Sequence, residues 1–447
     1  MTRAPTRTWR RCANSERARN RARELSRSIY DRSMAESTYL VTVSGPDRVG
    51  VGAELFKALA TLSEQGGRLR DVAQITIRGT LVLCAELTID DAVDEAEIHR
   101  ALAARTIAGA GISATVEAVV VDNVTHGRRL LVTLLAPLIS AGQLDCIFSA
   151  IAANGATCER IVHLATYPVD CYELVVRGSD HVALRLSLAG VAKECGLDLA
   201  VQRAGLHRRA KHLVVMDADS TLLQDEVIDL LADACGCAEE VSKITAATMA
   251  GEIDFGESLR RRVALLAGLP ASVLDDVRAK LRLTPGARTL IRTLQRLGYV
   301  PAVVSGGFVE VLAPLMEELG VQYLEANRLE IVEGRLSGRL ASETVDRAGK
   351  ARALARFAEE VGVPLEQTVA VGDGANDIDM ISLAGLGIAF NAKPVVREHA
   401  DAALSVPYLD AVLYFLGISR EEIETDDGPA SPGATKTTDG NDRVKLP

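Results

Sequence analysis

Two aspartates, Asp217 and Asp219, follow directly on the short apolar run 212–216. Reactive groups gather at the carboxyl ends of buried strands in α/β sheets, so both carboxylates can point into one pocket. Two negative charges this close need a cation, and a site made only of oxygen ligands suits Mg²⁺. One carboxylate could then attack phosphorus while the other moves the proton of the leaving oxygen. A solvated turn is the alternative, and for this pair alone it is the better interpretation.

Two further elements offer ligands for a phosphate group. The run 303–308 (VVSGGF) predicts a strand that ends in a small hydroxyl and two glycines before a helix. Glycines let backbone N–H groups approach a phosphate, and the hydroxyl of Ser305 adds a donor beside Gly306. Lys350 stands at the start of a predicted helix that runs through Phe357. A single helical lysine is usually exposed to solvent, so its assignment depends on the other elements.

A last strand-like run, 369–372 (VAVG), breaks into Asp373, Asn376 and Asp377. Their carboxylate and amide oxygens are suited to complete a magnesium shell. From residue 211 onward, buried strands alternate with helices in this way. That alternation predicts a doubly wound, Rossmann-like α/β core. Chance would seldom set acidic and glycine-rich strand ends in this order, each followed by a helix.

These four elements, over about residues 211–418, resemble the haloacid dehalogenase (HAD) superfamily of phosphotransferases. The forms D-x-D-S-T, S-G-G-F and G-D-G-A-N-D are similar to those of its phosphoserine phosphatases. The resemblance implies that Asp217 is the nucleophile and Asp219 first the general acid and then the base. It also implies Mg²⁺ held by Asp217, Asp373 and the backbone carbonyl of Asp219. The other implied residues support this site or hold the phosphoryl oxygens: Asn376, Asp377, Ser305, Gly306 and Lys350.

Substrate choice is expected from a helical cap at about residues 225–280. A zwitterionic phosphoamino acid needs an anion near its ammonium group and a cation near its carboxylate. The resemblance places Glu226 and Arg262 in these two roles, with Met249 and Phe255 as apolar cover. The alternatives are a glutamate in a solvated first turn and an arginine that faces water. The expected substrate is O-phosphoserine, in the last step of serine biosynthesis; another phosphoamino acid, a phosphoprotein, or a non-catalytic amino-acid sensor are the alternatives.

Before the core, the chain repeats a β-α-β-β-α-β pattern, which predicts two ferredoxin-like α+β domains at 38–122 and 128–204. In the first copy the elements fall near 39–44, 51–64, 68–77, 80–88, 93–105 and 113–120. Both copies resemble the ACT domain, which implies binding of serine or another amino acid. The candidate ligand residues are Asp47 and Gly50 in the first copy and Gly142 in the second. A strand-to-helix turn or a purely dimerising role are the alternatives, and a homodimer is expected.

The whole-chain composition sets the remaining expectations. The 447 residues are 48% hydrophobic and 25% charged with a net charge of -10, which disfavours nucleic acid as the main partner. No window of 18 uninterrupted apolar residues predicts a membrane span. Eight scattered cysteines predict reduced, buried thiols in a cytoplasmic protein, and the pair Cys235 and Cys237 is only weak support for a metal or redox site. Residues 1–37 are expected to be disordered or a mis-assigned start, and 421–447 a disordered tail.

Overall fold

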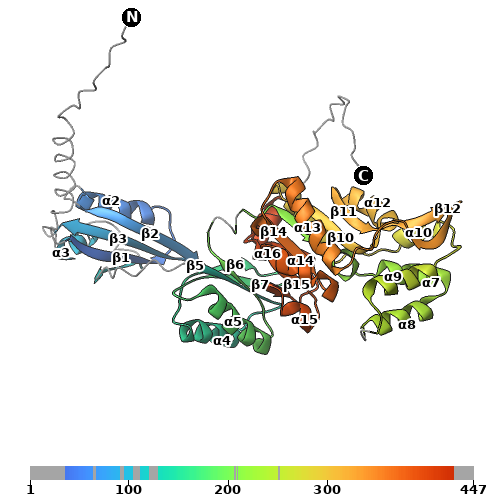
Figure 1. Cartoon of the computed structure of the whole chain (residues 1–447). Coiled ribbons are helices and arrows are strands. Elements are labelled where there is room, and N and C mark those ends of the chain that lie inside the picture. The colour runs from blue at the N-terminus through green and yellow to red at the C-terminus, as the bar shows by residue number, and fades with distance from the viewer. Residues whose placement is uncertain are drawn as a thin grey trace, which may run out of the picture. The chain divides into compact units, whose positions relative to one another are not determined.

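A computed structural model describes residues 36–63, 67–90, 95–103, 111–119, 129–205, 208, 210–249 and 252–426. The chain divides into two compact units, residues 1–125 and 126–447 (Figure 1). The N-terminal extension expected at 1–37 lies outside the described residues up to position 35, and Glu36 and Ser37 already belong to the first strand.

The first unit has the predicted β-α-β-β-α-β order. Its elements are β1 (Glu36–Pro46), α2 (Val51–Ser63), β2 (Arg68–Ile77), β3 (Thr80–Asp90), α3 (Glu95–Ala103) and β4 (Ser113–Val119). The sheet order is β2-β3-β1-β4, with β1 antiparallel to both of its neighbours. Alternate residues of β1, such as Val41 and Val43, are fully buried against Leu55 of α2. This period of two is why the sequence folds as a half-buried sheet with helices on one face.

The second repeat has the same order of elements. They are β5 (Arg129–Ala136), α4 (Ala141–Ala153), β6 (Thr157–Ala165), β7 (Asp170–Arg177), α5 (His181–Cys195) and β8 (Asp198–Arg203). Helix α4 begins with a capping box, in which the Ser140 hydroxyl accepts from the Gln143 amide and the Gln143 side chain accepts from the Ser140 amide. The two α+β domains of the predicted fold class are therefore confirmed.

The catalytic candidates lie on a parallel sheet of six strands. In spatial order these are β11 (Tyr323–Asn327), β10 (Val300–Phe308), β9 (Leu213–Met216), β14 (Thr368–Gly372), β15 (Gly387–Phe390) and β16 (Ala402–Leu404). Every residue of β9 is fully buried, as expected of a strand covered on both faces. The covering helices include α11 (Ala287–Arg296), α12 (Val309–Leu319), α13 (Arg347–Val361) and α14 (Ile378–Leu383). This is the predicted doubly wound core, and its carboxyl edge holds the motifs.

The second ACT-like domain and the core share one sheet. Strand β16 pairs antiparallel with β8 at Ala402 and Ala200, which joins six core strands and four repeat strands into a ten-stranded sheet. Across this seam the Gln202 side-chain amide donates to the carbonyl of Phe415 (2.8 Å), and both residues are buried. The sequence predicted the two domains as separate units and did not predict this pairing.

A helical cap follows β9 in the chain. It consists of α7 (Val227–Cys235), α8 (Ala238–Met249), α9 (Phe255–Ala264) and α10 (Val273–Arg278), and Figure 1 shows α7, α8 and α9 gathered beyond the end of β10. Helix α7 ends at Cys235 and is capped by Gly236, whose left-handed φ of 71° turns the chain, and Cys235 and Cys237 form a disulfide across this turn. The expectation of reduced, buried thiols is thus wrong for this pair, and Cys146 is exposed.

The C-terminal boundary also differs from the expectation. Helix α17 (Arg420–Asp426) lies within the range where a disordered tail was predicted, and residues 427–447 lie outside the described part. The helix forms because Ser419 and Glu422 cap its start through mutual hydrogen bonds, while Ile423 packs into the core. Over the described ranges, none of the helices has the length and apolar character needed to cross a bilayer.

Candidate active site

Asp217 lies where β9 ends between β10 and β14. Its backbone amide donates to the carbonyl of Val371 on β14 (2.9 Å), and its carboxylate accepts from the Ala218 amide (2.7 Å). The turn Ala218–Leu222 contains Ser220 at a φ of 56°, a left-handed conformation that non-glycine residues rarely adopt. Backbone strain of this kind typically occurs at functional sites, and here the turn directs two carboxylates to different partners.

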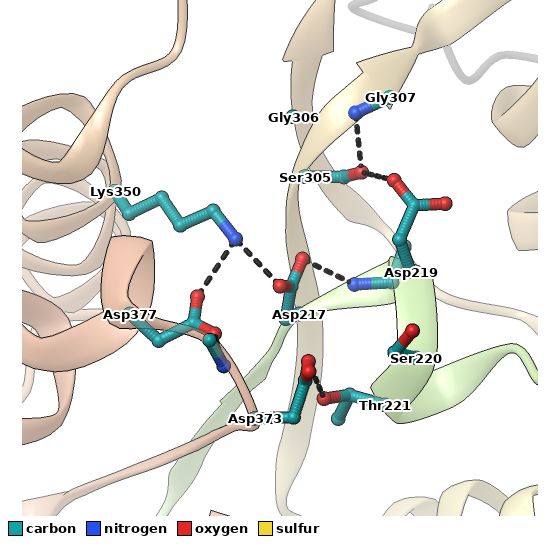
Figure 2. Close-up of polar contacts among 12 residues, drawn as sticks. Asp217, Asp219, Ser220, Thr221, Ser305, Gly306, Gly307, Lys350, Asp373 and Asp377 are labelled. Carbon is teal, nitrogen blue, oxygen red and sulfur yellow. Dashed lines mark hydrogen bonds and ion pairs between the residues drawn. The ribbon is translucent and has the colours of Figure 1, made fainter. Parts of the chain in front are cut away.

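Lys350 faces two carboxylates. Its ammonium nitrogen lies 2.7 Å from Asp217 Oδ2 and 2.7 Å from Asp377 Oδ1 (Figure 2). The lysine is fully buried on α13, whereas an ordinary helical lysine would reach water. Burial alone would lower the pKa of Lys350, but the two carboxylates raise it above its ordinary value. The ammonium group therefore stays charged and offsets part of the negative charge at the strand ends.

The acidic cluster can hold a cation. Oxygens of Asp217, Asp373 and Asp377 lie within 4.8 Å of one another. Burial, followed by the charge of Asp377, raises the pKa of Asp217 well above its usual range and that of Asp373 to about 6. Three such carboxylates exceed what a single ammonium group can neutralise, and hard oxygen ligands suit a small divalent cation. The Asp377 side chain, expected only to support the site, belongs to this group.

Asp219 has different surroundings from Asp217. One of its oxygens accepts from the Val227 amide (3.1 Å) at the start of α7, and the other faces the Ser305 hydroxyl (3.4 Å). Burial, followed by the negative charge of Glu226, raises the pKa of Asp219 to about 7. Two carboxyl groups held in distinct environments can take different roles, one ionised and one able to donate a proton.

The end of β10 forms a small polar loop beside Asp219. The Gly307 amide donates to the Ser305 hydroxyl (2.8 Å), as Figure 2 shows, and a Cβ on Gly307 would lie only 3.1 Å from Asp219 Oδ2. Asn327, which the sequence analysis missed, fixes this loop from β11. Its amide nitrogen donates to the Gly306 carbonyl, and its oxygen accepts from the amide of Val345, both at 2.8 Å. Asn327 belongs to no sequence motif, so only the structure, in which it is buried at the end of β11, identifies it.

A cavity of about 710 Å³ opens between the strand ends and the cap. Glu226 and Arg262 both line it, from the start of α7 and from α9. Arg262 is only 9% exposed, and its one hydrogen bond among the described residues is from Nε to the Ser258 carbonyl (3.4 Å). Glu226 accepts from the Ser220 hydroxyl (2.9 Å). The cavity therefore presents an anion and a nearly buried cation, as a zwitterion requires.

Other cavity-lining residues divide into expected and missed ones. Phe255 lies next to the loop at the end of β10, since a Cβ on Gly306 would come 3.4 Å from its ring. Phe255 and Asn376 both line the cavity. Met249 ends α8, but its side chain lies outside the described part of the chain. Asp229 and Lys393 were missed. Asp229 lies one helical turn beyond Glu226, and this spacing could have identified it. Burial lowers the pKa of Arg262, and the negative charge of Asp229 is the largest effect that raises it again.

The candidate regulatory residues lie where a strand leads into a helix in each of the two ACT-like domains. The Asp47 amide donates to the Gly79 carbonyl (2.8 Å), and Gly50 has a φ of 99° where the chain enters α2. That left-handed φ explains the glycine. Gly142 lies in the first turn of α4, beside the Ser140 hydroxyl.

Three parts of the chain match known protein families. Residues 214–382 match the haloacid dehalogenase-like hydrolases, and residues 37–108 and 128–202 each match an ACT domain. The chain is 52% identical over 408 residues to a phosphoserine phosphatase of Streptomyces coelicolor, covering 88% of this chain and 98% of that protein. It is 47% identical over 400 residues to the phosphoserine phosphatase SerB2 of Mycobacterium tuberculosis, covering 88% and 96%. A solved structure of a probable phosphoserine phosphatase from Vibrio cholerae, unliganded, matches with 31% identity, a TM-score of 0.52, and coverage of 67% of this chain and 89% of that one.

Proposed function

The chain belongs to the phosphoserine phosphatase family of haloacid dehalogenase-like hydrolases, and from this premise we propose that it hydrolyses O-phosphoserine through Asp217. The observation that carries the residue assignment is the contrast between two neighbouring carboxyl groups. Asp217 lies 2.7 Å from the Lys350 ammonium, while Asp219 has its pKa raised to about 7 by burial. Burial raises the pKa of both carboxyl groups, but Asp217 is in direct contact with the Lys350 ammonium and belongs to the proposed cation site, which together favour the anion that attacks, while Asp219 can give up a proton.

The reaction follows from these positions. The phosphate enters beside Ser305 and Gly306, and Asp217 attacks phosphorus to form an aspartyl-phosphate. As the ester bond breaks, Asp219 gives its proton to the leaving serine oxygen. Asp219 then takes a proton from water, and the hydroxide attacks phosphorus, which frees phosphate and restores Asp217. Lys350 keeps its charge throughout and reduces the repulsion between an aspartate and a phosphate.

We further propose Mg²⁺ as the cofactor, held by Asp217, Asp373, Asp377 and the backbone carbonyl of Asp219. When bound, it would neutralise phosphoryl and carboxylate charge as a Lewis acid. Its support lies in the cluster itself. Burial and the charge of Asp377 raise the pKa of Asp217, so this carboxylate ionises readily only while cations face it.

Phosphate release from a panel of esters tests the proposed function. With MgCl₂, O-phosphoserine should be preferred over glucose 6-phosphate by at least about 100-fold in kcat/KM, because the cap offers charges that only a zwitterion satisfies. Removal of the metal with EDTA should abolish turnover, and added MgCl₂ should restore it. Preference for a sugar phosphate or a phosphopeptide would contradict the substrate, and full activity in EDTA would contradict the cofactor.

The charged residues of the cap should recognise the amino-acid part of the substrate. Glu226 can face the ammonium group and Arg262 the carboxylate, and both line the cavity above the strand ends. Burial lowers the pKa of Arg262 from its ordinary value, while Asp229, Glu226 and Asp219 act in the opposite direction. A substrate carboxylate would give this nearly buried guanidinium the partner that it lacks among the described residues.

Replacing Arg262 with methionine should therefore change substrate preference. We expect kcat/KM for O-phosphoserine to fall by about 30- to 1,000-fold, the usual cost of removing one partner of a buried charge pair. Hydrolysis of p-nitrophenyl phosphate, which has no carboxylate, should fall far less. Arg261→Met is the matched control, because Arg261 is exposed and pairs with Glu257 at 2.7 Å. An equal loss for both substrates would assign Arg262 a structural role only.

The ACT domains support a regulatory proposal. We propose that serine or a related amino acid binds at Asp47 and Gly50, with Gly142 as the corresponding position of the second domain. Adding L-serine to the phosphate-release assay would show inhibition if this site regulates turnover, and unchanged kinetics would count against it. A homodimer and a cytoplasmic location complete the proposal; light scattering of the purified chain tests the first and cell fractionation the second.

A further inference from the structure

A second cavity, of about 660 Å³, lies on the seam between the second ACT domain and the catalytic core. We call it the seam cavity. Helix α5 and strand β8 line one side, and α15 (Pro394–Arg397) and β16 line the other. Because β8 and β16 are neighbours in one sheet, the two walls are fixed relative to each other. The volume is in the range of small-ligand sites.

The seam cavity is lined largely by small and apolar residues from both domains. Ala189 and Gly190 of α5 line one side, and Ala402 and Ala403 of β16 line the other. Leu186 lines the same cavity and is 65% exposed, which leaves a large apolar side chain available for contact. The small side chains explain why space remains where two domains otherwise pack closely.

Four charged residues at the cavity already have partners in the protein. Arg185 donates to the Ala400 carbonyl (3.3 Å) and Asp401 accepts from the Gly387 amide (3.0 Å). Asp198 accepts from the Ser405 amide (2.5 Å), and Arg397 donates to the Ser405 hydroxyl (2.7 Å). The bonds of Arg185 and Asp198 cross the seam and connect the two walls. Arg185 also lies 3.7 Å from Asp401, so these two opposite charges already face each other.

Two opposite charges remain. Lys193 on α5 and Glu398 after α15 both line the seam cavity and are exposed, and no hydrogen bond or ion pair of either side chain is found within the described ranges. One belongs to the ACT domain and the other to the core. A ligand with one anionic and one cationic group could pair with both, whereas a simple acid or amine could pair with only one of them.

We propose that the seam cavity binds a free α-amino acid with an aliphatic side chain. Lys193 takes its carboxylate, Glu398 takes its ammonium group, and the side chain lies against Leu186 and the alanines. This site is distinct from the ligand residues Asp47, Gly50 and Gly142, and it does not depend on the proposed phosphatase activity. It lies close to the catalytic cavity along the chain, because Ala392 and Pro394 line the seam cavity while Lys393 lines the catalytic one.

Titration calorimetry on the full chain tests the proposal, with L-leucine as the probe. We expect saturable binding with a Kd below about 1 mM, and no saturation by 4-methylpentanoate or 3-methylbutylamine, which each lack one charge. Lys193→Gln and Glu398→Gln should each weaken L-leucine binding by about tenfold or more. Glu194→Gln, a neighbouring exposed position that does not line the cavity, should bind as the wild type does.

A steric variant separates the seam cavity from any other site. A Cβ at Gly190 meets no atom within 4 Å, and leucine favours a helix over glycine, so Gly190→Leu should fold. It should abolish L-leucine binding, while Ala183→Leu on the exposed start of the same helix should not. The proposal is overturned if the wild type shows no binding, if Gly190→Leu binds normally, or if the singly charged analogues bind equally well.

Discussion

Asp217→Asn should lower phosphate release from O-phosphoserine by at least about 1,000-fold, because an amide cannot form the aspartyl-phosphate. The loss should appear in kcat, and acid quenching with ³²P-labelled substrate should trap phosphoenzyme in the wild type only. The variant should still fold, since asparagine retains the oxygen that accepts from the Ala218 amide. Asp276→Asn is the matched control, because Asp276 lies exposed on α10 and should keep full activity.

Each outcome of this experiment separates the hypotheses. Residual activity of the variant within tenfold of the wild type would show that Asp217 is not the nucleophile. A wild-type chain that hydrolyses no phosphate ester but binds an amino acid would favour the alternative of a non-catalytic sensor. Loss of activity together with a trapped phosphoenzyme in the variant would place the covalent intermediate on another residue.

Lys350→Met should damage both catalysis and folding. Removing the ammonium group leaves Asp217 and Asp377 buried without their shared cation, which should lower the free energy of unfolding by about 3–5 kcal/mol. The same change should reduce kcat by about 100- to 1,000-fold if Lys350 offsets charge in the transition state as we propose. Urea denaturation and steady-state kinetics measure the two effects. Lys280→Met, at an exposed position just after α10, is the control.

The stability loss of Lys350→Met should depend on pH in a defined direction. Burial and Asp377 raise the folded-state pKa of Asp217 above 3.8, so the folded state holds more protons than the unfolded state above about pH 4. The contribution of the Asp217 carboxyl group to the free energy of unfolding is present at low pH and is lost as the pH rises. Without Lys350, ionisation of Asp217 costs the folded state more free energy. In EDTA the free energy of unfolding of the variant should therefore differ more from that of the wild type at pH 7.5 than at pH 5. A difference independent of pH would show that Lys350 acts by packing alone.

Much of the candidate site was predictable because its residues lie at the ends of strands. Asp217, Ser305 and Asp373 each follow a buried run, and parallel strands bring such positions to one edge. The burial of Lys350 was not predictable from periodicity, since only the assembled sheet shows that α13 brings it to Asp217. Asn327 belongs to no motif, because its role is to connect two loops that are distant in sequence.

The order of elements in both repeats was also predictable, because each has a clear period of two or 3.6 residues. The pairing of β8 with β16 was not, since short edge strands in different domains carry no signal for their partner. The disulfide between Cys235 and Cys237 depends on a left-handed turn at Gly236, and α17 depends on a cap of two residues. Such local contacts change where a helix ends or begins, but they leave the hydrophobic periodicity of the sequence unchanged, so periodicity does not predict them.

The ten-stranded sheet has a consequence for how this protein can be divided. A shortened chain that began at residue 211 would leave β16 with an open edge, and one that stopped at 205 would do the same to β8. Open edges recruit strands from other molecules and promote aggregation. Since Ala402 and Ala200 join the two edges, we expect the second repeat to cover this edge of the core and the two to melt as a single cooperative unit. We expect that removing the second repeat would reduce the solubility of the protein more than its catalytic activity.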